Sequence, residues 1–327
     1  MPKKIVISEI GDADVLKYVD YTMPKKLNED FIRIKQTAIG LNYIDTYHRS
    51  GIYPLPVSLP VCPGLEGAGE IIEIGENVSN FSIGDRVCYA STPLGAYCEI
   101  RDFPAAKSIK IPNEISDEIA ASILLKGMTV EYLFERLNNI KKDEFILFHA
   151  AAGGVGLIAS QWARSIGCKM IGTVSSNEKV ILAKDNGCSH VINYKEENVV
   201  EKVMEITKGK GVSTVYDGVG KDTFDISLAC LDFRGLFVSF GQSSGMVEDV
   251  NLHSTFNPKS LYYTRPTLMH YTKNRKELID SSNTLFNKII KGSIKNNIFK
   301  KIDLKDASIA HKILQSRKTT GSIVLIP

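Results

Sequence analysis

The sequence predicts an α/β protein in which a doubly wound parallel sheet is inserted into a β-rich domain. Three observations predict this fold class. The first 120 or so residues alternate short apolar runs with Gly, Pro and Asn turns. From residue 144 onward, continuous apolar runs alternate with amphipathic helical patterns. The chain then ends on another strand-like run, SIVLIP.

Composition places the chain among ordinary globular proteins. Its 327 residues are 43% hydrophobic and 24% charged, which suits about two domains and excludes a disordered or fibrous chain. Forty basic and thirty-seven acidic residues leave a formal charge of +3, too balanced to indicate binding to nucleic acid or a membrane. No apolar run reaches a membrane span and no secretory signal is visible, so we expect a cytoplasmic protein.

The β-rich region is expected to begin the fold. FIRIKQTAIGL, GEIIEIG and DRVCYA read as strands joined by tight turns. The segment IPNEISDEIAAS changes this pattern, because Ser116 is a good N-cap and acidic residues follow it in the first turn. A helix is therefore predicted from Ser116, with helical spacing continuing from Met128 to Leu137.

The inserted domain is built from alternating strands and helices. Expected strands are EFILFHA, KMIGTV, HVINY, VSTVYDGV and GLFVSFG, and amphipathic segments separate them. Such a pattern specifies a parallel sheet covered on both faces, with right-handed crossovers. The residues from Leu268 contain a helix, ELIDSSNTLFNKII, and are expected to return to the β domain. The predicted domains are residues 1–125 with 268–327, and residues 126–267.

A glycine-rich turn joins the first of these strands to its helix. Ala151-Ala152-Gly153-Gly154-Val155-Gly156 has the context of a dinucleotide-binding turn. Gly153 allows a pyrophosphate to approach the backbone, while Gly156 permits close packing of helix and strand. Ala151 replaces the usual first glycine, and a plain glycine-rich turn is the alternative.

The end of the second strand distinguishes the two nicotinamide cofactors. An NAD enzyme places Asp or Glu there, whereas this chain reads GTVSSNEK. Ser175, Ser176 and Lys179 can bind a 2′-phosphate, and Glu178 is expected to serve the helix dipole. NADPH is therefore predicted over NADH, although Lys179 could instead be a solvated lysine. The cofactor residues predicted from the two turns are Ala152, Gly153, Gly154, Val155, Gly156, Gly172, Thr173, Ser175, Ser176 and Lys179.

Several motifs together carry a family resemblance. AIGLNYIDTYHRSGIYPLP, PGLEGAGEI, LLKGMT, HAAAGGVGLIASQWA and TTGSIVLIP resemble the zinc-free quinone oxidoreductases of the medium-chain dehydrogenase/reductase superfamily. The resemblance covers essentially the whole chain. It implies a GroES-like β domain in two sequence pieces with a Rossmann domain inserted between them, as the patterns above predict.

The resemblance also implies metal-free chemistry. Zinc-dependent alcohol dehydrogenases of the superfamily carry a zinc-binding Cys and a PGHE histidine, where this chain has NYID (residues 42–45) and PGLE (residues 63–66). Leu65 cannot bind a metal, no four-cysteine zinc lobe is present, and no local His or Cys spacing predicts a metal site. A quinone is electrophilic enough to accept hydride by positioning alone, so hydride transfer from NADPH to a quinone is expected.

By resemblance, the predicted site combines residues from the whole chain. Asn42 and Thr129 are expected near the nicotinamide, Lys126 beside the same cleft, and Tyr47 and Tyr53 against the acceptor. Either tyrosine could instead be a packed rim residue. The quinone's proton is expected from solvent. Asp45 could instead only hold a loop in place, and Arg317 could instead form a surface salt bridge. The predicted catalytic residues are Tyr47, Tyr53, Asn42 and Lys126. The further predicted cofactor residues are Asn42, Asp45, Thr129, Tyr194, Phe240, Gly241, Ser243 and Arg317.

Two other functions compete with quinone reduction. An NADPH-dependent reductase of α,β-unsaturated carbonyls would use the same cofactor, and a non-catalytic NADPH- or RNA-binding protein of the crystallin type is the second alternative. The near-neutral charge argues against RNA binding. The resemblance further implies a homodimer, for which the segment 235–265, with Leu261-Tyr262-Tyr263, could supply an edge strand or could be interior.

Overall fold

Two structural units make up the chain. The computed structural model describes all residues, 1–327. Unit 1 contains residues 1–128, 272–291 and 296–327, and unit 2 contains residues 129–271 and 292–295. Helix α2 (Asp117–Glu131) carries the chain from the first unit into the second.

Unit 1 is built on a seven-stranded sheet. Its strand order is β14-β15-β3-β4-β5-β7, with β6 also paired to β3. A separate hairpin of β1 (Lys3–Val6) and β2 (Lys17–Asp20) belongs to the same unit. The strands of the large sheet are β3 (Phe31–Leu41), β4 (Glu66–Ile74), β5 (Arg86–Ala90), β6 (Ile100–Pro104), β7 (Ile109–Lys110), β14 (Ile298–Asp303) and β15 (Ser322–Ile326).

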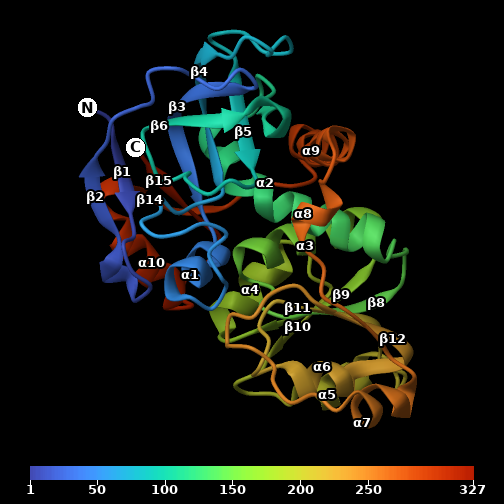
Figure 1. Cartoon of the computed structure of the whole chain (residues 1–327). Coiled ribbons are helices and arrows are strands. Elements are labelled where there is room, and N and C mark those ends of the chain that lie inside the picture. The colour runs from blue at the N-terminus through green and yellow to red at the C-terminus, as the bar shows by residue number, and fades with distance from the viewer. The chain divides into compact units, whose positions relative to one another are not determined.

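The C-terminal residues complete this sheet. Strand β15 runs antiparallel to β3, with Ile323 opposite Leu41, so the red end of the chain lies among the blue strands in Figure 1. Most of the last sixty residues, 272–291 and 296–327, belong to unit 1, whereas residues 268–271 and 292–295 belong to unit 2. Side chains such as Ile34, Leu325 and Ala310 of helix α10 (Ala307–Gln315) share one apolar core, which makes the two sequence pieces a single folding unit.

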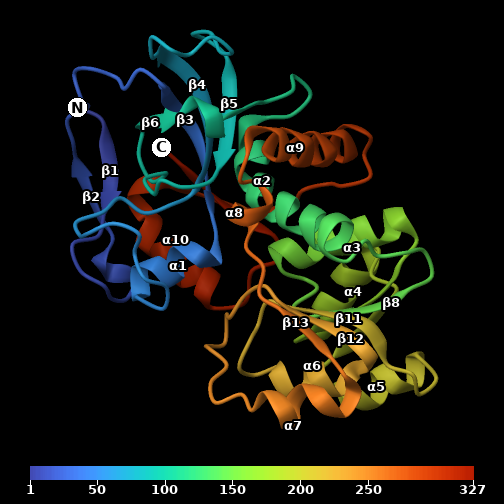
Figure 2. The ribbon, with the colours of Figure 1, turned by 45° about the vertical axis from the view of Figure 1, so that its right-hand side comes forward.

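Helices α2 and α9 (Arg275–Ile290) lie side by side. Helix α9 begins with a capping box between Asn274 and Glu277, and Figure 2 shows it beside α2. A Cβ atom on Gly127 of α2 would lie 2.5 Å from Cδ1 of Leu285. Glycine at position 127 therefore leaves room on α2 for the Leu285 side chain.

Unit 2 contains a six-stranded parallel sheet in the order β10-β9-β8-β11-β12-β13. This is the doubly wound order 3-2-1-4-5-6, in which ligands bind at the carboxyl ends of the strands where the order reverses. The reversal falls between β8 and β11. The predicted Rossmann fold is confirmed. Its elements are β8 (Phe145–Phe148), α3 (Gly154–Ile166), β9 (Lys169–Val174), α4 (Asn177–Asp185), β10 (His190–Asn193), α5 (Val199–Ile206), β11 (Val212–Asp217), α6 (Phe224–Cys230), β12 (Leu231–Ser239), α7 (Leu252–Phe256), β13 (Tyr262–Thr264) and α8 (Leu268–Tyr271).

The remaining helical predictions are largely confirmed. The Ile119 amide donates to Oγ of Ser116 over 3.3 Å, so Ser116 caps α2 as expected. After Glu131 the helix widens into a π-helical turn, Tyr132–Leu137, which the spacing does not predict. Helix α1 (Tyr43–Ser50) follows β3 directly. No helix of the structure is both long and apolar enough to cross a membrane.

Candidate functional site

The glycine-rich turn of unit 2 leaves the start of helix α3 without a cap. Gly153 is the N-cap residue, and no side chain accepts a hydrogen bond from the first turn. The positive backbone angle of the turn falls on Ala150, at φ 57°, and the Gly153 amide bonds the Ala150 carbonyl over 2.9 Å. Free N–H groups at a helix start form an anion site, so the α3 N-terminus suits a pyrophosphate.

Gly156 fits this turn for a different reason. A Cβ atom there would lie 2.4 Å from the carbonyl oxygen of Ala150 and 2.6 Å from the carbonyl carbon of Ala151. Both are backbone atoms, so a change of side-chain rotamer cannot relieve the overlap. Gly156 therefore keeps α3 against the end of β8, as predicted, and with it the amides that face the phosphate site.

Two predicted cofactor residues, Gly172 and Thr173, pack against the end of the neighbouring strand. A Cβ atom on Gly172 would lie 2.5 Å from Cβ of Ala151. The Thr173 side chain is buried, and its Oγ1 lies 3.0 Å from Nδ1 of His149. These contacts hold strands β8 and β9 together, so the residues support the turn from inside the sheet.

A buried polar network that the sequence analysis missed lies at the same ends of the strands. His149 follows β8, and its Nε2 lies 3.0 Å from Oγ of Ser227. Ser227 donates to Oδ2 of Asp217 over 2.8 Å, while Oδ1 accepts the Val219 amide over 2.7 Å. Burial lowers the pKa of His149. The available sequence signal was a polar residue ending each apolar strand, FILFH and STVYD.

The tip of β9 carries basic and hydroxyl groups. Nζ of Lys179 donates to Oγ of Ser175 over 3.4 Å. Burial and the charge of Lys195 both lower the pKa of Lys179. Two ammonium groups therefore face one region at the ends of β9 and β10, an arrangement that a 2′-phosphate dianion would stabilise. Lys195 was missed, although it directly follows the predicted Tyr194.

Of the other predicted residues near β9, Ser176 caps a helix and Tyr194 lies at the surface. Oγ of Ser176 accepts the Lys179 amide over 3.4 Å, which makes Ser176 the N-cap of α4. A hydrogen bond with Ser176 lowers the pKa of Glu178, consistent with its expected place in the first turn of α4. Tyr194 is 49% exposed, so its ring is accessible to a ligand.

The predicted segment after β12 is held against the end of β11. The Phe240 amide donates to the Asp217 carbonyl over 2.8 Å, and the Ser243 amide donates to the Gly218 carbonyl over 3.2 Å. A Cβ atom on Gly241 would lie 2.7 Å from the Gly218 oxygen. This places 240–243 beside the strand where the sheet order reverses. The predicted turns of unit 2 thus share the carboxyl edge of one sheet.

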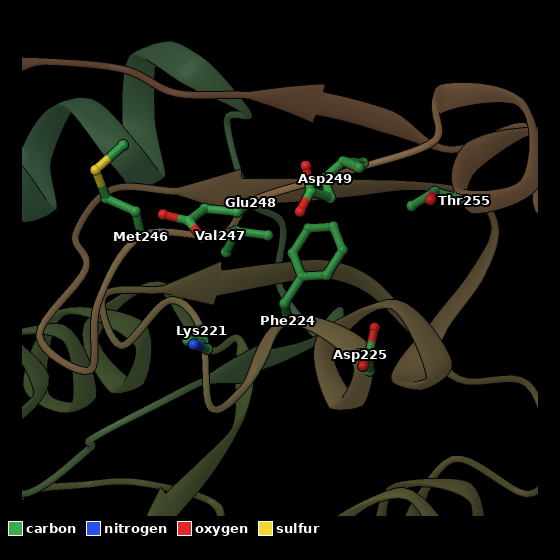
Figure 3. A pocket seen from close by; sticks show the side chains of 9 residues that line it. Lys221, Phe224, Asp225, Met246, Val247, Glu248, Asp249 and Thr255 are labelled. Carbon is green, nitrogen blue, oxygen red and sulfur yellow. The ribbon is translucent and has the colours of Figure 1, made fainter.

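A separate hollow of unit 2 does not suit a dinucleotide. It has a volume of about 460 Å³ and lies between α6 and the loop 246–250. Figure 3 shows the ring of Phe224 in it, with Asp225, Glu248 and Asp249 around the rim and Lys221 apart from them. Three carboxylates against one ammonium group would repel phosphate, so we place the phosphates at α3.

In unit 1, a buried carboxylate holds two of the predicted catalytic residues. Nδ2 of Asn42 donates to Oε2 of Glu66 over 2.7 Å, and Nζ of Lys126 lies 3.8 Å from the same oxygen. The Leu125 amide donates to Oε1 over 2.7 Å. A Cβ atom on Gly40 would overlap Glu66 at 2.3 Å. Glu66 was not predicted as a site residue, although it stands in the PGLE motif.

Burial affects both charges of this pair. It raises the pKa of Glu66 and lowers that of Lys126, while the hydrogen bonds and the opposite charge favour the ionised forms. The Lys126 ammonium also donates to the carbonyls of Leu41 and Ser122. Thr129, one turn further along α2, is also buried. The structure therefore joins Asn42 and Lys126 through Glu66.

Asp45 begins a second buried chain of polar groups. Its Oδ2 accepts the Asn42 amide over 2.9 Å and the Tyr97 hydroxyl over 3.1 Å. The Tyr97 oxygen lies 3.0 Å from Nε2 of His311, whose Nδ1 lies 3.4 Å from Nη1 of Arg49. Arginine only donates, so Nδ1 of His311 accepts, Nε2 donates to Tyr97, and Tyr97 donates to Asp45. No sequence signal links these distant positions.

The ionisation of Asp45 should be visible in stability. Burial raises the pKa of this carboxyl from 3.8 to about 7, and its Oδ1 has no partner. Between these values the folded protein binds more protons than the unfolded chain, so the free energy of unfolding falls as pH rises. We expect Asp45 to account for a loss of about 3 kcal/mol between about pH 5 and pH 8.

Urea unfolding at several pH values will test this expectation. Asp45→Asn keeps an acceptor for Asn42 and Tyr97 but cannot ionise. The free energy of unfolding of this variant should therefore not show the decrease between about pH 5 and pH 8. Asp30→Asn, at an exposed position, is the matched control and should retain it. Equal slopes for Asp45→Asn and the unmutated protein would show that Asp45 does not titrate in this range.

The predicted aromatic pair is present on one helix and the turn after it. The rings of Tyr47 and Tyr53 have centroids 5.1 Å apart, and Tyr43 lies 6.2 Å from Tyr47. Tyr47 is only 7% exposed. Arg317 follows α10, and its charge counteracts the burial that raises the pKa of Tyr43. Unit 1 therefore brings Arg317 and the three tyrosines into one region.

The donor set of unit 1 does not fit a zinc ion. Leu65 offers no ligand atom, and both oxygens of Glu66 are hydrogen-bonded. No group of three His, Cys, Asp or Glu side chains is arranged to hold a metal ion. The amides of the α3 turn and the ammonium groups at the tip of β9, by contrast, fit a phosphorylated dinucleotide.

Comparison with known proteins identifies similar chains over the full length. The family described as alcohol dehydrogenase GroES-like domain matches residues 28–133, and the one described as zinc-binding dehydrogenase matches residues 154–285. A quinone oxidoreductase of Salmonella typhimurium is 49% identical, with all of both chains covered. A 2-haloacrylate reductase of Burkholderia sp is 44% identical, with 90% of each chain covered.

Solved structures are also similar. The crystal structure of Escherichia coli quinone oxidoreductase complexed with NADPH superposes with a TM-score of 0.97 and is 50% identical, covering 99% of this chain and all of the other. The structure of a 2-haloacrylate reductase has a TM-score of 0.88 at 40% identity, covering 99% of each chain.

Proposed function

This chain belongs to the quinone oxidoreductases of the medium-chain dehydrogenase/reductase superfamily, and we propose that it reduces quinones with NADPH at the residues described above. The observation that carries the choice of cofactor is the pair of ammonium groups, Lys179 and Lys195, at the strand tip where an NAD enzyme has an acid. NADPH is also the nucleotide bound in the similar Escherichia coli structure.

The residues of unit 2 bind and orient the nucleotide in this proposal. The amides of the α3 turn, from Gly153 to Gly156, hold the pyrophosphate. Lys179 and Lys195 hold the 2′-phosphate, with Ser175 and Tyr194 beside them. The segment from Phe240 to Ser243 borders the nicotinamide ribose. NADPH supplies a hydride from C4 of its nicotinamide, and a quinone that gains this hydride and one proton becomes a hydroquinone.

The residues of unit 1 position the acceptor. Tyr47 and Tyr53 present aromatic rings that stack on a quinone, and their hydroxyl groups can donate to its carbonyl oxygens. Glu66 fixes the amide of Asn42, and Asp45 fixes its backbone. Arg317 lies in this region, where its charge acts on Tyr43. Side chains held rigidly in this way lower the entropic part of the barrier to hydride transfer. This positioning requires no metal.

Steady-state kinetics will test the proposal. NADPH oxidation is followed with 1,4-benzoquinone, with 9,10-phenanthrenequinone and with an alkenal, each against a blank without enzyme. We expect turnover with both quinones and a higher kcat/KM with NADPH than with NADH. Absence of enzymatic NADPH oxidation with either quinone would overturn the proposal.

Reduction of α,β-unsaturated carbonyl compounds is the second candidate. The similarity to 2-haloacrylate reductase favours it, because that protein's name describes an unsaturated acid as substrate. Both reactions deliver hydride to an electron-poor acceptor, so the same residues serve both. A large kcat/KM preference for the alkenal in the assay above would favour this second candidate.

An exposed edge strand supports a homodimer. Strand β13 pairs on one side only, with β12, and Tyr262 and Tyr263 are 62% and 48% exposed. A free strand edge with apolar side chains is a natural pairing surface. Sedimentation should give twice the 36.1 kDa chain mass.

All six cysteines are free thiols, which suits the cytoplasmic location we propose.

A further inference from the structure

Two cysteines of unit 1, distant in sequence, lie in contact. The Tyr97 amide donates to the Pro63 carbonyl over 3.0 Å, which brings the neighbouring side chains of Cys62 and Cys98 together so that their thiols interact. Sγ of Cys62 also lies 3.4 Å from the carbonyl oxygen of Tyr97, the residue that precedes Cys98. Cys62 is half-buried, whereas Cys98 is buried. A small oxidant therefore has a route to the pair past the more exposed thiol.

The surroundings of the pair are positively charged. The hydrogen bond with Cys62, and after it the charges of Arg101 and Lys4, lower the pKa of Cys98 against the opposing effect of its burial. Arg101 is buried, its Nη2 donates to the Leu94 carbonyl over 3.2 Å, and its Nη1 has no partner. The Gln36 amide also donates to Sγ of Cys98 over 3.4 Å. Positive charge beside a thiol favours the thiolate, which is the reactive form.

The other four cysteines lack these features. Cys88, Cys168, Cys188 and Cys230 are buried, and burial raises the pKa of each of these thiols, as it does that of Cys62. Their hydrogen-bond partners, where present, are backbone carbonyls, as for Cys168 with Glu144 and Cys188 with Met170, and the Ser160 side chain for Cys188, rather than a second thiol. Thiol reactivity is therefore concentrated at Cys62 and Cys98, a pair that the proposed reaction does not use.

We propose that Cys62 and Cys98 form a peroxide-sensitive dithiol that closes to an intramolecular disulfide. The Cys98 thiolate attacks one oxygen of hydrogen peroxide, the O–O bond breaks, and after protonation a sulfenic acid and one water result. Sγ of Cys62 then displaces the hydroxyl group from Cys98, losing its own proton. The S–S bond forms and a second water leaves. Two thiols are oxidised and one peroxide is reduced.

The disulfide would act on the chain of polar groups that begins at Asp45. An S–S bond is about 2.05 Å long, shorter than any contact between two thiols, so closure draws the segment of Tyr97 and Cys98 towards Cys62. The hydroxyl of Tyr97 donates to Asp45, and Asp45 holds the Asn42 amide. Oxidation should therefore lower quinone turnover. This effect rests on the proposed function, whereas formation of the cross-link does not.

Thiol titration and peptide mapping of the full chain will test the proposal. After treatment with hydrogen peroxide and removal of the excess, titration in denaturant should find two fewer thiols than the six of the untreated protein. Mapping under non-reducing conditions should find a Cys62–Cys98 cross-link in a monomeric chain. Dithiothreitol should restore all six. Loss of thiols without this cross-link, or a cross-link between two chains, would overturn the proposal.

Variants separate the two parts of the proposal. Cys62→Ser and Cys98→Ser should each prevent the loss of a thiol pair, whereas Cys88→Ala, in the same unit, should still form the cross-link. Mapping of the unmutated protein keeps the test decisive if a variant fails to fold. If the cross-linked enzyme retains full quinone turnover, the coupling to Asp45 is wrong and the modification site stands alone.

Discussion

Replacing Lys179 with alanine weakens NADPH binding by about 10- to 150-fold and leaves NADH binding nearly unchanged. A hydrogen bond to a charged group contributes about 1.5–3 kcal/mol, and each 1.4 kcal/mol or so is about tenfold in affinity. The 2′-phosphate is the only part of NADPH that NADH lacks, so the loss should fall on NADPH alone. Titration calorimetry with both nucleotides measures it.

Stability measurements distinguish this role from a structural one. Burial and the charge of Lys195 both lower the pKa of Lys179, so its ammonium group is disfavoured in the free protein, and Lys179→Ala should not destabilise it. The rise in melting temperature on adding NADPH should shrink instead. Lys184→Ala, on the same helix, is the matched control and should bind both nucleotides normally. Equal losses for NADH and NADPH would refute the assignment to the 2′-phosphate.

Replacing Glu66 with alanine should lower the free energy of unfolding by about 3–5 kcal/mol, the usual cost of removing one partner of a buried ion pair. The change leaves Lys126 buried with carbonyl partners only and removes the acceptor of Nδ2 of Asn42 and of the Leu125 amide. We therefore also expect a raised KM for the quinone. Urea titration and steady-state kinetics measure the two effects.

Two further variants define the origin of the effect. Glu66→Gln retains the shape and acceptor oxygen, so it should lose less stability than alanine does. Glu70→Ala, at an exposed position on the same strand, should change the free energy of unfolding by less than about 0.5 kcal/mol. If Glu66→Ala lowers the free energy of unfolding no more than Glu70→Ala does, the buried carboxylate does not organise this region.

The sequence could predict unit 2 well because its signals are local. Continuous apolar runs such as FILF and KMIGTV reflect burial on both faces of a parallel sheet, and Gly153 and Gly156 reflect the needs of one turn. Lys179 could likewise be singled out, since the strand tip and the helix start are neighbours in sequence. Gly172 and Thr173 belong to the same stretch, yet their packing against Ala151 and His149 depends on which strand lies alongside.

The amino-acid sequence by itself determined the fold class, the position of the phosphate turn and the basic character of the strand tip, because each depends on residues within a few positions of one another. Only the tertiary structure decided that Glu66 joins Asn42 to Lys126, that Tyr97 and His311 lie behind Asp45, and that Cys62 meets Cys98. These partners come from separate strands and loops. Their spacing in sequence carries no periodic pattern, and burial shifts a pKa only after distant segments have packed together.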